Sequence, residues 1–191
     1  MTESQAIQTS VMVTGKIGAG KSTVTRFLCE EFGFGVVGFG ATVRAKAKEL
    51  GLGSDRRTLQ DVGHDLISRL GEPALVNMAI AYSELASRGR VAFDGIRNAA
   101  AEEYTRSLAE ATYLIFVDLD DERRRSRILE RTQGEPLTSE ALIEMEKHPI
   151  ESGIDALRSR AELVVSNDGT PAQLLEEVKR FLLSRGITKP R

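Results

Sequence analysis

The sequence predicts an α/β protein in which a parallel β-sheet is covered by helices on both faces. The main evidence is the order of segments: short apolar stretches alternate with stretches whose apolar residues recur at helical spacing. The first apolar stretch also runs into a glycine-rich turn, VTGKIGAGKST, which opens a helix. A hydrophobic share of 41% and a charged share of 28% over 191 residues are typical of a soluble domain with a sizeable core.

The predicted strands are short runs of β-branched and other apolar residues. They are residues 10–14, 36–39, 91–93, 113–117 and 163–166. Because continuous apolar runs are typical of strands buried on both faces, the pattern favours a parallel sheet. Residues 1–9 are polar, and we expect them to precede the first strand as a short leader.

Helices are predicted where apolar side chains recur every three or four residues. The first helix shows this pattern at Val24, Leu28 and Phe32, and Gly33 ends it. The predicted helices are residues 21–32, 42–50, 59–70, 73–85, 100–110, 122–131, 140–147 and 171–184. Since no strand separates the helices at 59–70 and 73–85, we expect them to form a flap over a site at the strand ends.

The charge balance gives no reason to expect a nucleic acid or an anionic membrane as partner, because 26 basic and 28 acidic residues leave a net charge of -2. The single cysteine cannot form an intrachain disulfide, which fits a reducing compartment. The N-terminus has no signal-peptide pattern, and no apolar run approaches the roughly 18 residues that span a bilayer. We therefore expect a cytoplasmic protein with a small-molecule partner, as a monomer or a homodimer.

The glycine-rich turn matches the P-loop pattern G-x-x-x-x-G-K-[ST] at Gly15, Gly20, Lys21 and Ser22. In such a loop, backbone N–H groups and the helix N-terminus bind phosphate oxygens, the lysine reaches the β- and γ-phosphates, and the serine binds Mg²⁺. The predicted ATP-binding residues here are Gly15, Lys16, Ile17, Gly18, Ala19, Gly20, Lys21, Ser22 and Thr23. The alternative is a glycine-rich turn that holds a lysine by chance.

A second motif, VAFDGIRN, places an acidic residue at the end of a buried parallel strand, where it points into the crevice above the sheet. Asp94 is expected to hold Mg²⁺, directly or through water, or to orient an acceptor hydroxyl. Arg97 is expected to bind a phosphate. The alternative is that Asp94 caps a helix and that Arg97 is a solvated charge.

A third motif, ERRRSRILER, puts Arg124, Arg127 and Arg131 on one helix face. Like charges stacked in this way repel unless an anion lies opposite, and a triphosphate in transfer supplies one. We expect Arg127 and Arg131 to act in catalysis, Arg127 also to bind ATP, and the following TQGEP to form a lid. The alternative is that Glu122 and Glu130 neutralise part of the cluster.

Further polar residues are predicted to complete both halves of the site. Arg44 lies in the first turn of a helix, where a cation conflicts with the helix dipole unless a phosphate is bound; the alternative is a solvated basic face. The turn VVSNDGTP is expected to present Asn167, Gly169 and Thr170 to a nucleobase, or else to cap the next helix through Asn167 or Thr170. Polar candidates for acceptor specificity in the flap are Arg57, Gln60 and Asp61.

With these motifs the chain resembles the P-loop nucleotide kinases, namely adenylate-kinase-like proteins, deoxynucleoside monophosphate kinases and dephospho-coenzyme A kinases. The resemblance runs from the P-loop to the last helix and implies a three-layer P-loop NTPase fold, with a five-stranded parallel sheet in the order 2-3-1-4-5. It implies that Arg44 contacts the acceptor monophosphate and that NDGT lies near the adenine. Two features depart from relatives: GFGA replaces the acidic turn of dephospho-coenzyme A kinases, and the short lid has no cysteines for zinc.

The resemblance implies a single kinase domain over residues 1–191. Its core is expected at 10–52, 89–131 and 161–185, its acceptor-binding flap at about 40–88, and its lid at about 132–140. The predicted reaction moves the γ-phosphoryl group of ATP, with Mg²⁺, to a (deoxy)nucleoside monophosphate. The predicted catalytic residues are Lys21, Asp94, Arg127 and Arg131, and the acceptor residues are Arg44, Arg57, Gln60, Asp94 and Arg97. Two alternatives stay open: a kinase for a hydroxyl acceptor such as dephospho-coenzyme A or a nucleoside-like metabolite, and a regulatory P-loop ATPase without an acceptor.

Overall fold

The computed structural model describes residues 7–83, 85, 89–131 and 138–190, without the side chains of Arg131 and Ser139. Its strands are β1 (Ile7–Thr14), β2 (Gly35–Gly38), β3 (Arg90–Asp94), β4 (Ala109–Asp118) and β5 (Leu163–Ser166). Its helices are α1 (Lys21–Phe32), α2 (Phe39–Glu49), α3 (Arg56–Leu70), α4 (Glu72–Tyr82), α5 (Ala99–Ser107), α6 (Asp121–Arg131), α7 (Ser139–Glu146), the 3₁₀ turn η1 (Pro149–Glu151), α8 (Ile154–Arg158) and α9 (Pro171–Ser184).

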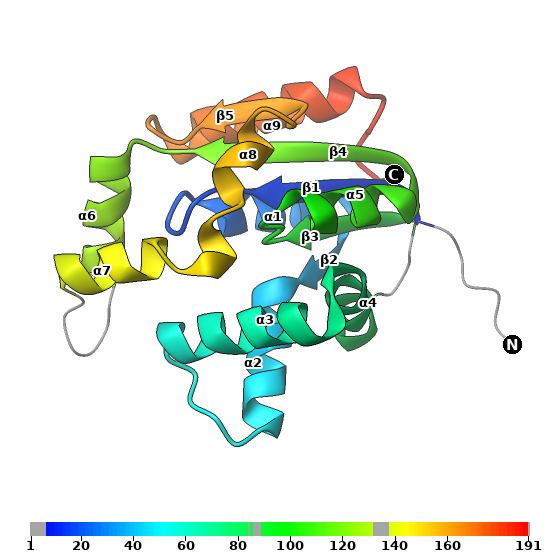
Figure 1. Cartoon of the computed structure of the whole chain (residues 1–191). Helices are drawn as coiled ribbons and strands as arrows, with labels where there is room; N and C mark the ends of the chain where they lie inside the picture. Colours follow the sequence, from blue (N-terminus) through cyan, green and yellow to red (C-terminus); the bar gives the residue numbers. More distant parts are fainter. Residues whose placement is uncertain (1–6, 84, 86–88, 132–137, 191) are drawn as a thin grey trace, which may run out of the picture.

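The five strands form one parallel sheet in the order β2-β3-β1-β4-β5, which confirms the predicted fold class (Figure 1). The strand that leads into the glycine-rich loop, β1, lies at the centre between β3 and β4. The order changes direction at β1, because β2 and β3 lie on one side of it and β4 and β5 on the other. This switch point at the carboxyl ends of the strands is where open α/β sheets bind their ligands.

Helices cover both faces of the sheet, because successive strand residues point to opposite faces. On β1, Val11 and Val13 pack with α1 and α9, whereas Met12 packs on the other side with α2 to α5 and α8. Both faces therefore hold a buried apolar core, and the molecule has the predicted three layers. Within the described residues no helix is both long and apolar enough to cross a membrane.

The first strand begins earlier than its hydrophobicity predicts, at Ile7 instead of Ser10. Ile7 pairs with Ala109 of β4, and the backbone N–H of Thr9 donates to the carbonyl of Gly89 at 2.9 Å. These added residues belong to the strand because of ladder pairing, which a pattern of side chains does not report. The predicted polar leader therefore ends inside β1.

The helix predicted at residues 100–110 is shorter, and β4 is longer than predicted at its start. Asn98 caps α5 by accepting a hydrogen bond from the N–H of Ala101 at 2.9 Å, and α5 ends at Ser107. Strand β4 then begins at Ala109, four residues before the predicted start at Tyr113. Polar residues at the start of β4 concealed it, since neighbouring strands supply the pairing.

The segment between α7 and β5 holds two elements that the sequence did not predict, η1 and α8. Both are too short for apolar periodicity to show. The predicted lid at about 132–140 lies mostly outside the described residues. The predicted flap corresponds to α2, α3 and α4, which pack together below β2 and β3 (Figure 1).

Candidate functional site

The glycine-rich loop joins the end of the central strand to α1. Thr14, the last residue of β1, pairs with Phe116 of β4, and Val13 pairs with Asp94 of β3. Gly15 has φ +137°, and a Cβ there would lie 2.3 Å from the carbonyl oxygen of Val117. The loop therefore leaves the sheet through a close backbone approach that only glycine permits.

The far end of the loop is fixed by the turn that follows β5. The Asn167 side chain is buried, and its Nδ2 donates to the carbonyl of Ala19 at 2.7 Å. Gly20, which precedes α1, has φ +106°, and a Cβ there would lie 2.3 Å from the same Nδ2. No side chain caps α1, so the N–H groups of Lys21 and Ser22 stay available for an anion, whereas that of Thr23 donates to the carbonyl of Gly20 at 3.0 Å.

In this structure Lys21 folds back onto its own loop. Its Nζ donates to the carbonyls of Gly15 at 2.7 Å and Lys16 at 2.9 Å. Burial, and next the positive charge of Arg97, lower the pKa of Lys21 to about 8, although Asp94 and a second carboxylate act in the opposite direction. A phosphate would give the ammonium group the counter-charge that it lacks.

The residues predicted to bind Mg²⁺ lie at the ends of two neighbouring elements. Ser22 is exposed in the first turn of α1, and Asp94 ends β3 beside β1. Burial raises the pKa of Asp94, and the charges of Lys21 and Arg97 offset part of that rise. The described residues contain no cluster of three or more metal-binding side chains. A hydroxyl and a carboxylate nevertheless fit Mg²⁺, which takes one or two protein ligands and completes its shell with phosphates and water.

The alternative roles for the VAFDGIRN motif are wrong. Asn98, and not Asp94, caps α5. Arg97 is no solvated charge either: its side chain is 24% exposed and forms an ion pair with the buried carboxylate of Glu151.

A pocket lies beside this loop, between the flap helices and the turn after β3. Its volume is about 60 Å³. Three arginines from three different elements line it: Arg44 from α2, Arg56 from α3 and Arg97 from the turn. The other lining residues are Phe39, Gly40, Val43, Leu59, Gln60, Ile67, Glu72, Leu75, Gly95, Ile96, Asn98 and Ile150. The pocket thus combines an apolar wall with three cationic groups and one carboxylate, that of Glu72, which accepts a hydrogen bond from Asn98.

The carboxylate of Glu151 pairs with two of these arginines, and the sequence did not predict it as a site residue. Its side chain is 5% exposed, and its Oε1 pairs with Arg97, lies 3.4 Å from Arg56 Nη2, and accepts a hydrogen bond from Gln60 Nε2 at 3.0 Å. Burial works to raise the pKa of Glu151, but Arg97, Gln60 and Arg56 together hold it below its usual value. No pattern around Glu151 signals this role, because its partners lie about 55 to 95 residues away along the chain.

Of the three predicted flap residues only Gln60 lines the pocket, and Asp61 is exposed and pairs with His148. Gln60 is buried, lines the pocket and donates to Glu151 and to the carbonyl of Met145. Arg57 points away from the pocket, with a side chain 76% exposed, and forms an ion pair with Glu144. The neighbouring residue Arg56 lines the pocket instead. Periodicity in the sequence did not tell which of two adjacent arginines faces inward.

Arg44 lies at the pocket in an exposed position. Because α2 begins at Phe39, Arg44 belongs to its second turn and not to the first. The predicted conflict with the helix dipole is therefore weaker than expected, since that effect is confined to the first turn. What supports Arg44 as a site residue is its place beside Arg56 and Arg97.

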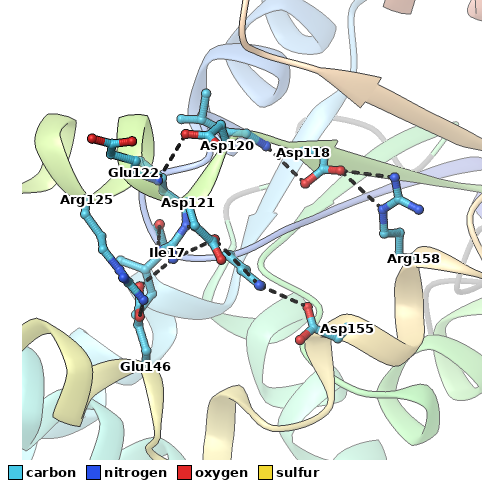
Figure 2. Close-up of polar contacts among 12 residues, drawn as sticks. Ile17, Asp118, Asp120, Asp121, Glu122, Arg125, Glu146, Asp155 and Arg158 are labelled. Carbon is cyan, nitrogen blue, oxygen red and sulfur yellow. Dashed lines mark hydrogen bonds and ion pairs between the residues drawn. The ribbon is translucent and has the colours of Figure 1, made fainter.

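The arginines of α6 do not act as one anion-binding face. Arg124 is 1% exposed, pairs with Asp121 and Glu146, and donates to the carbonyl of Ile17 at 3.0 Å. Figure 2 shows Asp121, Glu146 and Ile17 gathered where α6, α7 and the glycine-rich loop meet. The prediction that Arg124 faces the triphosphate is therefore wrong, because its charge is already neutralised by the carboxylates of Asp121 and Glu146. The side chain of Arg131 lies outside the described residues.

Arg127, three residues after Arg124 on the same helix, contacts the turn after β5. Its Nη2 donates to the carbonyl of Asn167 at 3.2 Å, and Arg123 donates to the carbonyl of Asp168 at 2.6 Å. Thr170 caps α9 by accepting a hydrogen bond from Gln173 N, as one of the two alternatives predicted. Gly169 lies in the same turn, so the predicted nucleobase-binding residues remain together beside the loop.

Lys16, the second residue of the loop, joins α6 to α8 across the loop. Its Nζ lies 3.6 Å from Asp121 and 3.5 Å from Asp155, and Figure 2 shows both carboxylates. All three side chains are more than a third exposed, so these ion pairs are weak. Lys16 is thus free to rearrange when a ligand enters.

Comparisons with known proteins agree with this architecture. Residues 14–144 match the AAA_17 family model, described as an AAA domain. The chain is similar to the UPF0200 protein of Methanothrix thermoacetophila, with 30% identity over 172 residues that cover 88% of this chain and 93% of the relative.

Among solved structures, TT1252 from Thermus thermophilus is similar with a TM-score of 0.61 and 22% identity, over 93% of this chain and 97% of that one. Shikimate kinase from Acinetobacter baumannii, in complex with shikimate, is similar with a TM-score of 0.59 and 18% identity, over 95% and 96% of the two chains. At these identities the likeness shows the fold, which is that of P-loop kinases.

Proposed function

We propose that this chain, which belongs to the UPF0200 family and carries an AAA domain, is an Mg²⁺- and ATP-dependent phosphotransferase with a small anionic acceptor. The acceptor class that we favour is a (deoxy)nucleoside monophosphate. The observation that carries the proposal is the adjacency of a phosphate loop and an arginine-lined pocket. The two halves meet at the end of β1, because the hydroxyl of Thr14, which precedes the loop, donates to the carbonyl of Ile96 beside Arg97 at 2.6 Å.

The donor half of the site is the glycine-rich loop with α1. The free N–H groups at the start of α1 and the ammonium group of Lys21 provide the positive charge that the β- and γ-phosphates need. Ser22 and Asp94 would hold Mg²⁺, which supplies charge neutralisation of the phosphates when bound. Arg127 and the turn Asn167–Thr170 would frame the base, with the Asn167 side chain holding the loop in place.

The acceptor half is the pocket lined by Arg44, Arg56 and Arg97. Three guanidinium groups around one pocket bind a phosphate through charge-assisted hydrogen bonds that an uncharged acceptor cannot provide. In this site Arg56 takes the place first predicted for Arg57. A phosphate acceptor needs no strong general base, since positioning and electrostatic stabilisation provide most of the rate enhancement.

A panel of acceptors tests the proposal. The protein is incubated with ATP and Mg²⁺, and ADP formation is measured with each nucleoside monophosphate, deoxynucleoside monophosphate, dephospho-coenzyme A and shikimate. We expect turnover that depends on a monophosphate. Replacing Arg97 by Gln should then lower kcat/KM about 10- to 100-fold, from the loss of one charge-assisted hydrogen bond. Arg57→Gln is the matched control and should leave kcat/KM unchanged, because its side chain lies outside the pocket.

A hydroxyl acceptor is the second candidate, and Asp94 is the observation that favours it. Its carboxylate ends β3 beside the loop, and burial raises its pKa, which makes it a better base for a hydroxyl proton. In that case Asp94→Asn lowers kcat by about 10²- to 10⁴-fold at saturating Mg²⁺, whereas the Arg44→Ala change has little effect. With a monophosphate acceptor, Arg44→Ala raises KM strongly. ATP hydrolysis that no acceptor changes would instead identify a regulatory ATPase and overturn both candidates.

A further inference from the structure

The two acceptor arginines that lie deepest are already occupied by a carboxylate of the protein. Arg56 and Arg97 both line the pocket, and both contact the same oxygen, Oε1 of Glu151. Two guanidinium groups held side by side repel each other, and a counter-anion is needed to keep them together. Glu151 supplies that anion while no ligand is bound.

The pairing of Glu151 is incomplete. Its Oε1 serves Arg97, Arg56 and Gln60 together, whereas its Oε2 is buried and has no hydrogen-bond partner in the described part of the chain. Arg56 Nε is also buried without a hydrogen-bond partner there. Buried polar atoms without partners carry a desolvation cost, so this arrangement is less favourable than a fork-to-fork pair with both oxygens used.

The element that carries Glu151 is short and has room beside it. Glu151 is the last residue of the three-residue turn η1, which hydrogen bonds to His148 and Pro149 hold. Glu151 also lines a second cavity of about 180 Å³, to which Lys16 and Arg125 contribute and Arg56 and Arg97 do not. The same cavity is lined by the carboxylates of Asp121, Glu146 and Asp155, and these already pair with its cations. A carboxylate that leaves the arginines therefore finds space there, but its charge is not fully compensated, which favours its return when no ligand is bound.

The acceptor pocket is narrow in this state. Its volume of about 60 Å³ is well below the roughly 300 Å³ at which ligand pockets begin, so a nucleotide needs the pocket to widen. Arg44 lies at the same pocket, and no carboxylate is paired with it among the described residues, so it is available to the incoming anion first.

We propose that Glu151 is a built-in competitor for the acceptor site, and that an acceptor phosphate displaces its carboxylate from Arg56 and Arg97 into the neighbouring cavity. This inference rests on the proposed function, because it assigns the pocket to an anionic acceptor. It also makes Glu151 a specificity-determining residue. A phosphate dianion replaces a carboxylate on two arginines at a gain, whereas an acceptor carboxylate only exchanges like for like.

The first test is a calorimetric titration of inorganic phosphate into protein saturated with ADP, which occupies the phosphate loop. Glu151→Gln removes the competing charge and should tighten phosphate binding at least tenfold. Adding Arg97→Gln to that variant should abolish the gain, which locates it in the pocket. Glu144→Gln is the matched control, because it removes an exposed carboxylate that pairs with Arg57, and should leave phosphate binding unchanged.

If the Glu151→Gln variant binds phosphate no more tightly than the wild-type protein, the proposal that phosphate displaces Glu151 is overturned. Acetate that binds the wild-type protein as tightly as phosphate overturns the preference for phosphate. A protein that does not bind ADP contradicts the proposed function. The inference about Glu151 is decided separately, by whether adding Arg97→Gln removes the tighter phosphate binding of the Glu151→Gln variant.

The second test uses the wild-type protein, so it does not depend on the folding of a variant. Displacement frees η1 and the start of α8, and hydrogen exchange of amides in residues 149–158 should become faster when phosphate is added. Slower or unchanged exchange in that segment, at a phosphate concentration that saturates the pocket, overturns the proposal.

Discussion

The affinity of the protein for ATP should fall as the pH rises through 8, because of Lys21. In the unliganded protein its pKa is lowered to about 8 by burial and then by Arg97. A bound triphosphate adds negative charge beside the ammonium group and raises that pKa, so the complex holds one proton more than the free protein above pH 8. Binding is therefore strongest below pH 8 and loses affinity above it.

The size of this effect follows from the pKa. If Lys21 stays charged in the complex, the dissociation constant for MgATP is proportional to 1 + 10^(pH − 8). It therefore increases about tenfold between pH 7 and pH 9. Isothermal titration of MgATP at several pH values measures it. Lys21→Arg is the control, because arginine stays charged over this range and leaves only the titration of the ligand itself. A wild-type slope no steeper than that of Lys21→Arg would refute the reasoning.

Three further outcomes are expected. Ser22→Ala should weaken ATP binding about tenfold with Mg²⁺ and not at all without it, as measured by paired titrations, since the hydroxyl is expected to bind the metal and not the nucleotide. Asn167→Ala leaves the buried carbonyl of Ala19 without its donor and should lower the free energy of unfolding, measured by thermal melting, by about 1–3 kcal/mol. An unchanged free energy would mean that water replaces the amide. Arg124→Met leaves Glu146 without its buried partner and should lower the free energy of unfolding by about 3–5 kcal/mol. Arg125→Met, on the exposed side of the same helix, should lower it by under about 1 kcal/mol, and equal losses would contradict the burial argument.

Apolar periodicity alone located much of the fold. The bounds predicted for Lys21–Phe32, Leu163–Ser166 and Pro171–Ser184 agree with α1, β5 and α9. These elements carry their own boundary signals, such as the glycine after α1 and the proline that opens α9. The ends of β1 and β4 were missed because the partner strands, and not local side chains, decide where a parallel ladder begins.

The residues of the proposed donor half could be named from the sequence because they lie close together in the chain. Gly15, Gly20, Lys21 and Ser22 lie within one loop and the helix that follows it, and the backbone geometry that glycine permits is itself the binding element. The donor residues came from the pattern, and the structure adds that Asn167 holds the loop from the far end.

The acceptor half depends on contacts between distant segments. The choice of Arg56 over Arg57 is decided by how α3 rotates against the sheet, and the pairing of Arg124 by the approach of α7. Glu151 carries no motif, and only the packing of η1 against α3 and the turn after β3 brings it onto two arginines.

The sequence by itself determined the glycine-rich loop, the parallel α/β layers and the presence of basic residues near the strand ends. Each of these follows from residues close together in the chain, where spacing and backbone preference are sufficient. Only the tertiary structure decided which charges face a ligand and which are neutralised inside the protein. Electrostatic interaction depends on distance and burial in space, and neither is written in the order of the residues.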